Sequence, residues 1–387
     1  MFYLSGIAID LFLVVLLASK RNKSEADAIL MVWLFMIGLH LILFYLFVTK
    51  RYYEFPLMLG LGIPFPLLHG PFLYLYTSSL TQQVSHQVLR FLHFLPFVLT
   101  YLIMLPFFFA PAEHKIYTYE HQGERYQWIL YPLHLAILLS GIVYFVLSLI
   151  TLNKHRKNIE NQFSNTDKIN LNWLRYLIVG LLIIWIAVIF TSDVYIFTVV
   201  VLYIFFIGFF GIKQTAVFAY NNIHPTSSKF SIQDLPDTSN GVEPESDVSN
   251  EDTGNTEKIK YMKSGLSEQE QQEIHAMLSH LMEQGKPFTN PELTLGDVAD
   301  QLKVHPNNLS QVINSVAQKN FYDFINSRRV AEFIHQVRQP ENQNFTLLSI
   351  AYECGFNSKS SFNRNFRKIT GLSPSEYLKT HTEPIVA

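Results

Sequence analysis

The sequence predicts an all-α protein built from two parts, a seven-transmembrane helix bundle and a C-terminal all-helical domain with two helix-turn-helix units. Three observations lead to this prediction. Apolar blocks of membrane-spanning length follow one another up to about residue 212. From about residue 267, after a polar stretch, apolar residues return at helical spacing. Within this C-terminal part, a pattern of two short helices joined by a tight turn occurs twice.

The overall composition averages these two parts. The 387 residues carry a net charge of −2 and only 16% of them are charged, against about 25% in a typical soluble domain. The single cysteine, Cys354, permits no intramolecular disulfide and no cysteine-based metal site. This fits a reducing compartment. Because Cys354 precedes Gly355 in a helix-turn-helix pattern, we expect it to be a small buried side chain.

A helix needs about 20 mostly apolar residues to cross a bilayer, because it rises about 1.5 Å per residue through ~30 Å of hydrocarbon. The blocks that meet this length cover roughly 2–19, 28–49, 55–78, 91–110, 128–152, 174–191 and 193–212. The first block lacks a basic start and a small-residue cleavage site, so it is expected to be retained rather than removed as a signal peptide. Prolines and glycines interrupt the third block and predict a kinked helix there.

Lysine and arginine in the short loops predict the orientation of the bundle. With the N-terminus outside, the inner loops hold nine of them: Lys20, Arg21, Lys23, Arg90, Lys154, Arg156, Lys157, Lys168 and Arg175. The outer loops hold four: Lys50, Arg51, Lys115 and Arg125. Seven crossings would then place the C-terminal part in the cytoplasm.

Several predicted spans contain polar residues that are costly in lipid. His40, His69 and His134 are candidates for a membrane signal site, because such groups usually face the bundle interior and often mark a ligand or ion path. The alternative is that each histidine only makes an interhelical hydrogen bond. Asp10 and Asp193 are expected near the outer surface, in water.

Residues 213–258 predict a disordered acidic linker. Its central stretch, 234–257, has eight acidic and no basic residues. Such a segment buries too little apolar surface to offset the entropy of ordering. The same charge would be repelled by nucleic acid and by anionic lipid.

The third part, 267–387, begins with a helix whose Ser267 and Glu270 form a capping-box signature. Residues 293–318 predict the first helix-turn-helix. In the second unit, Phe362, Phe366 and Ile369 are expected on the inner face of the last helix. Between the units, 320–337 predicts one helix of about 18 residues, ~27 Å long. Such a helix could carry two reading helices to major grooves about one DNA turn apart.

The run IAYECGFNSKSSFNRNFRKITGLSPSEYLK, which begins at residue 350, resembles the signature of the AraC/XylS family of bacterial transcription regulators. The resemblance covers a core of about 280–380. The resemblance implies that the domain binds double-stranded DNA in a sequence-specific way and that RNA polymerase is a partner. It also implies that the bundle lies in the bacterial cytoplasmic (inner) membrane. The residues that carry it are Ile350, Ala351, Gly355, Phe356, Ser358, Ser360, Phe362, Arg364, Phe366, Gly371, Ser373, Pro374 and Tyr377.

The side of each recognition helix opposite its apolar stripe is the candidate DNA-binding face. Arg364 is the strongest candidate for a guanine edge, because arginine can donate to O6 and N7 together. The connecting helix's Arg328 and Arg329 either pair with Asp323 or Glu332 or reach a phosphate, and one of the two is expected to be structural. The full candidate set is Asn307, Asn308, Ser310, Gln311 and Asn314 on the first helix, with Lys359, Ser360, Asn363, Arg364, Arg367 and Lys368 on the second.

The C-terminal domain is not basic, with 12 Lys and Arg against 13 Asp and Glu in 263–387. One copy should therefore bind DNA weakly, and a homodimer formed through the bundle would raise avidity. The sequence thus predicts a membrane-bound one-component transcription regulator that needs no cofactor and answers a small-molecule or lipid signal. A transporter or channel with a regulatory helix-turn-helix tail is the alternative. An enzyme is not expected, since no P-loop, nucleophile elbow, metalloprotease helix or GxGxxG occurs.

Overall fold

The computed structural model describes residues 2–82, 87–167, 169–223 and 266–381. Within these ranges every regular element is a helix, apart from one isolated bridge between Phe163 and Thr294. The chain divides into two compact units. The first holds residues 1–155 and 171–219, and the second holds 156–170 and 220–387.

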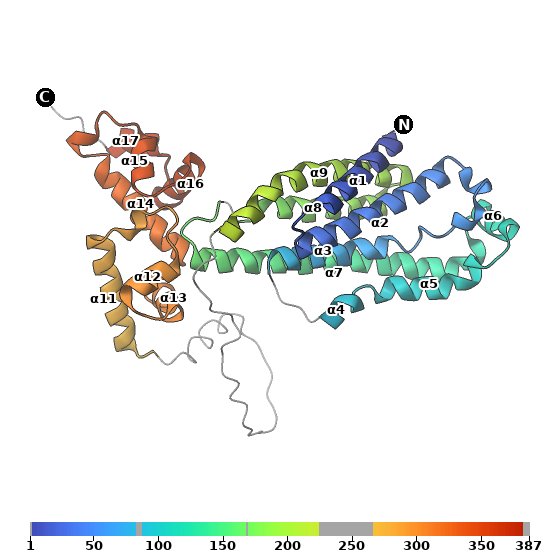
Figure 1. The fold of residues 1–387 in the computed structure, drawn as a ribbon, viewed down its shortest axis with the longest axis horizontal. Coiled ribbons are helices and arrows are strands. Elements are labelled where there is room, and N and C mark those ends of the chain that lie inside the picture. The colour runs from blue at the N-terminus through green and yellow to red at the C-terminus, as the bar shows by residue number, and fades with distance from the viewer. Residues whose placement is uncertain (1, 83–86, 168, 224–265, 382–387) are drawn as a thin grey trace, which may run out of the picture. The chain divides into compact units, whose positions relative to one another are not determined.

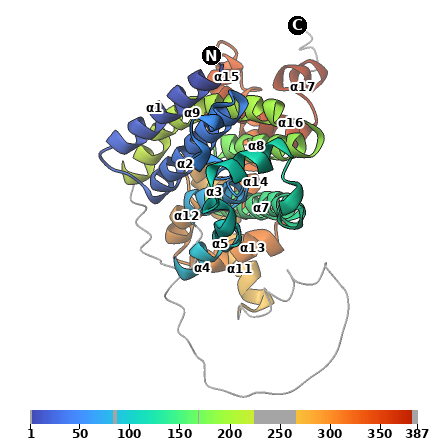
Figure 2. The same ribbon diagram turned by 90° about the vertical axis from the view of Figure 1, so that its right-hand side faces the viewer.

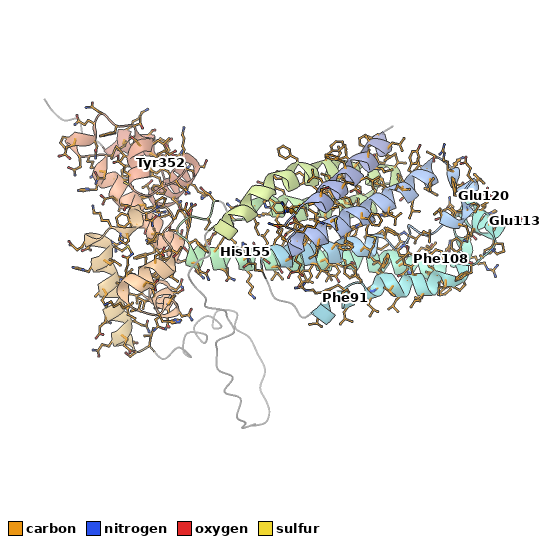
Figure 3. All side chains as sticks on the ribbon, in the orientation of Figure 1. Phe91, Phe108, Glu113, Glu120, His155 and Tyr352 are labelled. Atoms are coloured by element: carbon orange, nitrogen blue, oxygen red, sulfur yellow. The ribbon has the colours of Figure 1, made fainter. Side chains whose placement is uncertain are left out.

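The first unit is a bundle of helices that run alongside one another (Figures 1 and 2). Short 3₁₀ turns, η1 to η3, lie at Arg51–Tyr53, Pro56–Met58 and Glu124–Tyr126. The chain leaves the first unit at His155, within α7 (Figure 3). The helices are α1 Phe2–Ser19, α2 Glu25–Val48, α3 Pro66–Leu80, α4 Gln87–Leu92, α5 Leu95–Phe108, α6 Ala112–Glu120, α7 Gln127–Gln162, α8 Asn172–Phe190 and α9 Asp193–Ile223.

The bundle is apolar both inside and outside. Trp33, Leu41 and Leu174 are fully buried at its core. On its outer side large apolar side chains are open to the surroundings, such as Val15 at 62% exposure. Phe91, at 76% exposure, is another (Figure 3). A helix that is hydrophobic all round belongs in a large core or in a membrane. This surface is therefore compatible with a membrane protein.

The number of seven spans is not confirmed. Among the described residues, five helices are long and apolar enough to cross a membrane, or six if the bent pair α5 and α6 counts as one. The one α-helix in the third predicted span is α3, which has 15 residues, because the chain turns at Gly60, with φ +84°, and the helix starts at Pro66. The fourth contains α5, with 14 residues, after which the chain bends by 111° into α6.

Two other expectations for this half also need correction. Asp10 is fully buried rather than wet, in contact with Gly38 where α1 packs on α2. Both of its carboxylate oxygens lack a hydrogen-bond partner among the described residues. Asp193 is exposed, as expected. Residues 213–223, assigned to the linker, continue α9, and the rest of the predicted linker lies outside the described residues.

The second unit contains the expected helices of the C-terminal domain (Figure 1). The capping box of Ser267 and Glu270 is confirmed, and so is Gly371 as a left-handed C-cap with φ +79°. The helices are α11 Glu268–Gln284, α12 Leu295–Leu302, α13 Pro306–Ser315, α14 Phe321–Gln336, α15 Leu347–Glu353, α16 Lys359–Thr370 and α17 Pro374–His381, with 3₁₀ turns η4 at Pro287–Thr289 and η5 at Pro340–Asn342.

Helix α14 is the shared support of two small cores. Its first half contributes Phe324 and Ile325 to a core with α11, α12 and α13. Its second half contributes Val330 and Phe333 to a core with α15 and α16. With 16 residues it is about 24 Å long. The prediction that Ile369 joins the second core is wrong, since that side chain is 44% exposed.

Candidate functional site

The first helix-turn-helix is formed by α12 and α13. Thr294 caps α12 and exchanges hydrogen bonds with Asp297 in a capping box. The helix ends at Lys303, which has the left-handed conformation with φ +58°. Helix α13 then starts at Pro306, where the missing N–H costs nothing. Local chemistry therefore sets both ends of the turn.

The second helix-turn-helix is formed by α15 and α16. Its turn requires glycine at Gly355, where φ is +96° and an added Cβ would collide with the carbonyl oxygen of Phe288. Helix α16 begins at the N-cap Ser358, whose hydroxyl accepts from the N–H of Ser361 at 3.1 Å. Cys354, in the same turn, is buried as expected.

Helix α16 has clearly separated faces. Its inner face buries Phe362 and Phe366 in the second core. The six candidate DNA-binding residues all lie on exposed positions: Lys359, Ser360, Asn363, Arg364, Arg367 and Lys368. Four of them, Ser360, Asn363, Arg364 and Arg367, follow the i, i+3, i+4, i+7 spacing that makes one helix face.

Two of these cations already have partners along one edge of that face. Lys368 donates to Asp323 of α14 at 2.6 Å. Arg364 Nη2 donates to the Tyr322 hydroxyl at 3.1 Å and to Asp167 Oδ1 at 2.9 Å. Burial alone would lower the pKa of Arg364, but these hydrogen bonds outweigh it and raise the pKa. Arg364 stays cationic, and its guanidinium is partly occupied in this structure.

Helix α13 presents a weaker face. Asn307 is exposed, whereas Asn308, Ser310 and Asn314 are partly exposed. Asn314 also donates to the Ser310 carbonyl oxygen at 2.8 Å, which engages part of its amide. Gln311 is only 6% exposed and does not lie on the accessible side. Gln311 lies on the same helix face as Ser315, one turn later, and the Ser315 hydroxyl donates to a side chain of α11. Helix α11 therefore covers this part of α13.

Arg329 has a structural role, but its partners are not those expected. Glu332 pairs with Lys286 at 2.8 Å and Asp323 with Lys368. Arg329 is 2% exposed and donates instead to neutral oxygens, among them the Phe288 carbonyl at 2.7 Å. Burial lowers its pKa to about 10.

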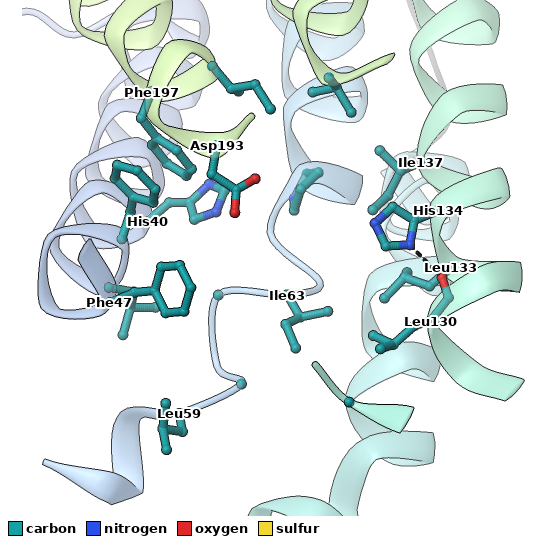
Figure 4. A pocket seen from close by; sticks show the side chains of 18 of the residues that line it. His40, Phe47, Leu59, Ile63, Leu130, Leu133, His134, Ile137, Asp193 and Phe197 are labelled. Atoms are coloured by element: carbon teal, nitrogen blue, oxygen red, sulfur yellow. Dashed lines mark hydrogen bonds between the residues drawn. The ribbon is translucent and has the colours of Figure 1, made fainter. Parts of the chain in front are cut away.

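The first unit holds a mostly apolar cavity of about 500 Å³. The three histidines named as a membrane signal site, His40, His69 and His134, all line it, together with Trp33 and Phe197. In Figure 4, His40 from α2 and His134 from α7 stand on opposite sides of the space. The arrangement brings together residues from three distant parts of the sequence.

Hydrogen bonds determine which ring nitrogens of the cavity's histidines are donors and which are acceptors. Trp33 Nε1 can only donate, so His69 Nδ1, 3.3 Å away, accepts. Neutral His69 then carries its proton on Nε2 and donates to His40 Nδ1 at 3.4 Å. His40 is left with an N–H donor at Nε2. At His134, Nδ1 lies 2.7 Å from the Leu130 carbonyl and must donate, which leaves Nε2 as an acceptor in the neutral ring.

Comparisons with known proteins concern the second unit. A family model described as a helix-turn-helix domain matches residues 298–380. The melibiose operon regulatory proteins of Escherichia coli strains K12 and O6:H1 (CFT073) are each 31% identical over 87 residues. The aligned part is 22% of this chain and spans only 28% of the length of those relatives. No solved structure gives a significant match. With the motif at 350–377, these matches show that the chain carries an AraC-type helix-turn-helix domain at its C-terminus.

Proposed function

We propose that this protein is a membrane-bound one-component transcription regulator that reads specific DNA with α13 and α16 and answers a signal bound in its membrane domain. The observation that carries the proposal is the exposed row of Ser360, Asn363, Arg364 and Arg367 on α16, within an AraC-type domain. Arginine and asparagine are the side chains best suited to guanine and adenine edges in the major groove. RNA polymerase is the proposed partner of the bound regulator.

The apolar bundle supports the membrane part of the proposal. With the N-terminus outside, five crossings would place the C-terminal domain in the cytoplasm, whereas six would place it outside, so the proposal requires that the bent pair α5 and α6 does not cross. The cavity supports a signal site. It combines apolar walls with a donor on His40 and an acceptor on His134, which suits a lipid-soluble small molecule with polar groups at both ends. A ligand acts only if it favours one state of the bundle.

The test is selection of DNA from a random pool by the full-length protein in lipid nanodiscs. We expect a bipartite site with half-sites about one DNA turn apart. Arg364→Ala should then relax preference at one base pair and cost ~1–3 kcal/mol of binding free energy. Lys368→Ala, a candidate phosphate contact, should weaken binding to all sequences equally. If no sequence is enriched over the starting pool, the proposed function is wrong.

A transporter or channel is the second candidate, because the cavity places a hydrogen-bonded pair, His40 and His69, inside the bundle. Intramembrane ionisable groups often mark a transport path. This alternative predicts solute flux across proteoliposomes that His40→Phe abolishes. It also predicts that the C-terminal domain has no preferred DNA sequence, so the selection experiment separates the two functions.

A further inference from the structure

A short segment that follows α7 in sequence packs against the DNA-binding domain. This docked segment, residues 163–167, belongs to the second unit although α8 follows it along the chain. Phe163 forms an antiparallel bridge with Thr294. The Ser164 N–H and hydroxyl both donate to the Leu293 carbonyl, at 3.2 and 2.6 Å. Ser164 is 1% exposed, so it is fully enclosed by the domain.

The surface under Ser164 is specific for this backbone. Arg329 has five N–H donors, and three of its hydrogen bonds go to the domain itself, to the Phe288 and Asn290 carbonyls and to Asn326 Oδ1. The other two go to Ser164, to its carbonyl oxygen at 3.3 Å and its hydroxyl at 3.1 Å. Asn326 Nδ2 donates to the same carbonyl at 3.0 Å. Leaving buried donors of a charged group unsatisfied is costly, so the two Ser164 oxygens are needed as acceptors as long as the segment covers Arg329.

The far end of the docked segment reaches the DNA-reading helix. Asp167 Oδ2 accepts from the hydroxyl of Ser358, the N-cap of α16, at 2.9 Å, and Oδ1 accepts from Arg364 Nη2 at 2.9 Å. Arg364, the strongest candidate to contact a guanine edge, is therefore paired with the Asp167 carboxylate. Arg364 cannot direct the same Nη2 N–H to a base while it donates to Asp167, and the carboxylate would repel the approaching phosphates.

We propose that the surface formed by Leu293, Asn326, Arg329, Ser358 and Arg364 is a docking surface for residues 163–167 of this chain, and that docking and DNA reading exclude each other. This rests on the proposed function of α16. Because the segment is continuous in sequence with α7 and α8, a change in these two helices can pull it from the surface. The signal would then need to stabilise only the undocked arrangement.

The experiment compares full-length protein in nanodiscs, without added signal, on the DNA duplex enriched by selection. Asp167→Asn removes the carboxylate charge that holds Arg364. Exposed ion pairs are worth at most ~1 kcal/mol, so we expect about two- to fivefold tighter binding. Glu160→Gln is the matched control, since Glu160 lies just upstream of the segment and pairs with Arg156. Equal affinity of Asp167→Asn and wild type on an enriched duplex would overturn the docking proposal while leaving the proposed function intact.

A second readout follows the segment itself. Thr166 is 8% exposed, so Thr166→Cys in a Cys354→Ala background should react slowly with a maleimide. Adding the enriched duplex should speed labelling at least several-fold, because DNA selects the undocked state. Labelling that stays slow with saturating duplex would show that docking and reading coexist, and labelling that is fast without DNA would show that the segment is not docked. Either result would refute the proposal.

Discussion

Replacement of Gly355 by alanine should destabilise the DNA-binding domain far more than the same change at Gly371. Both glycines have positive φ, +96° and +79°. A non-glycine residue in a left-handed conformation costs roughly 1–2 kcal/mol, and this term applies to both. The surroundings differ. A Cβ at Gly371 meets nothing within 4 Å, whereas a Cβ at Gly355 would collide with the Phe288 carbonyl and lie 2.9 Å from Arg329 Nε.

The clash at Gly355 cannot be relieved by a flexible side chain. The carbonyl of Phe288 is backbone and also accepts from Arg329 at 2.7 Å, so moving it would disturb the buried guanidinium. Overpacking of this kind typically adds about 1–3 kcal/mol. We therefore expect Gly355→Ala to cost about 2–5 kcal/mol of unfolding free energy and Gly371→Ala about 1–2 kcal/mol.

Tryptophan fluorescence would report the first unit, which holds all four tryptophans: Trp33, Trp128, Trp173 and Trp185. The assay therefore needs another probe, one that follows the second unit. Hydrogen exchange of α14 peptides from the full-length protein in nanodiscs, followed across a urea series, reports the unfolding of both small cores. If Gly355→Ala and Gly371→Ala lost equal unfolding free energy, the steric reasoning would be refuted, since the two variants share only the cost of a positive φ.

Two further predictions concern side chains around the same turn. Burial raises the pKa of Cys354 to about 12, so iodoacetamide at pH 8 should alkylate it at least 100-fold more slowly in folded protein than in urea, as followed by mass spectrometry. Burial tends to raise the pKa of Glu332, but the hydrogen bond from Lys286 outweighs it and leaves the pKa lowered. The pair's contribution is therefore present above the unfolded pKa of about 4.3 and lost as pH falls below it. Stability measured by hydrogen exchange should therefore fall less between pH 6 and pH 3 in Lys286→Met than in the wild type.

The parts of the fold that follow from neighbouring residues could be predicted from the sequence. The capping box at Ser267 depends on residues three positions apart, and Gly355 and Gly371 signal positive φ by their own chemistry. Composition alone indicated the membrane half. Composition could not distinguish a membrane-spanning helix from an apolar segment broken by proline and glycine, because both have the same average hydrophobicity. The third and fourth predicted spans therefore differ from α3 and α5.

The contacts that could not be predicted join residues far apart in the chain. Arg329 was expected to pair with acids on its own helix, but two of its acceptors come from Ser164, 165 positions away. Arg364 and Asp167 are 197 positions apart. Gln311 had the side chain of a base reader, and only the packing of α11 removes it from the accessible face. Helical periodicity specifies which face is inward, but not which neighbour covers the rest.

The charge balance of the domain explains why so small a contact can matter. Residues 263–387 carry 12 basic and 13 acidic side chains, so DNA binding depends on few cations rather than on a broad positive field. Each phosphate neutralised contributes about 0.9 to the slope of log affinity against log salt. In this structure Arg364 is held by Asp167 and Lys368 by Asp323. Asp323 belongs to α14 of the same domain, so the docked segment withholds one of the four cations on α16, Arg364. A weakly basic domain is therefore well suited to control by a single carboxylate, whereas a strongly basic one would bind DNA regardless of it.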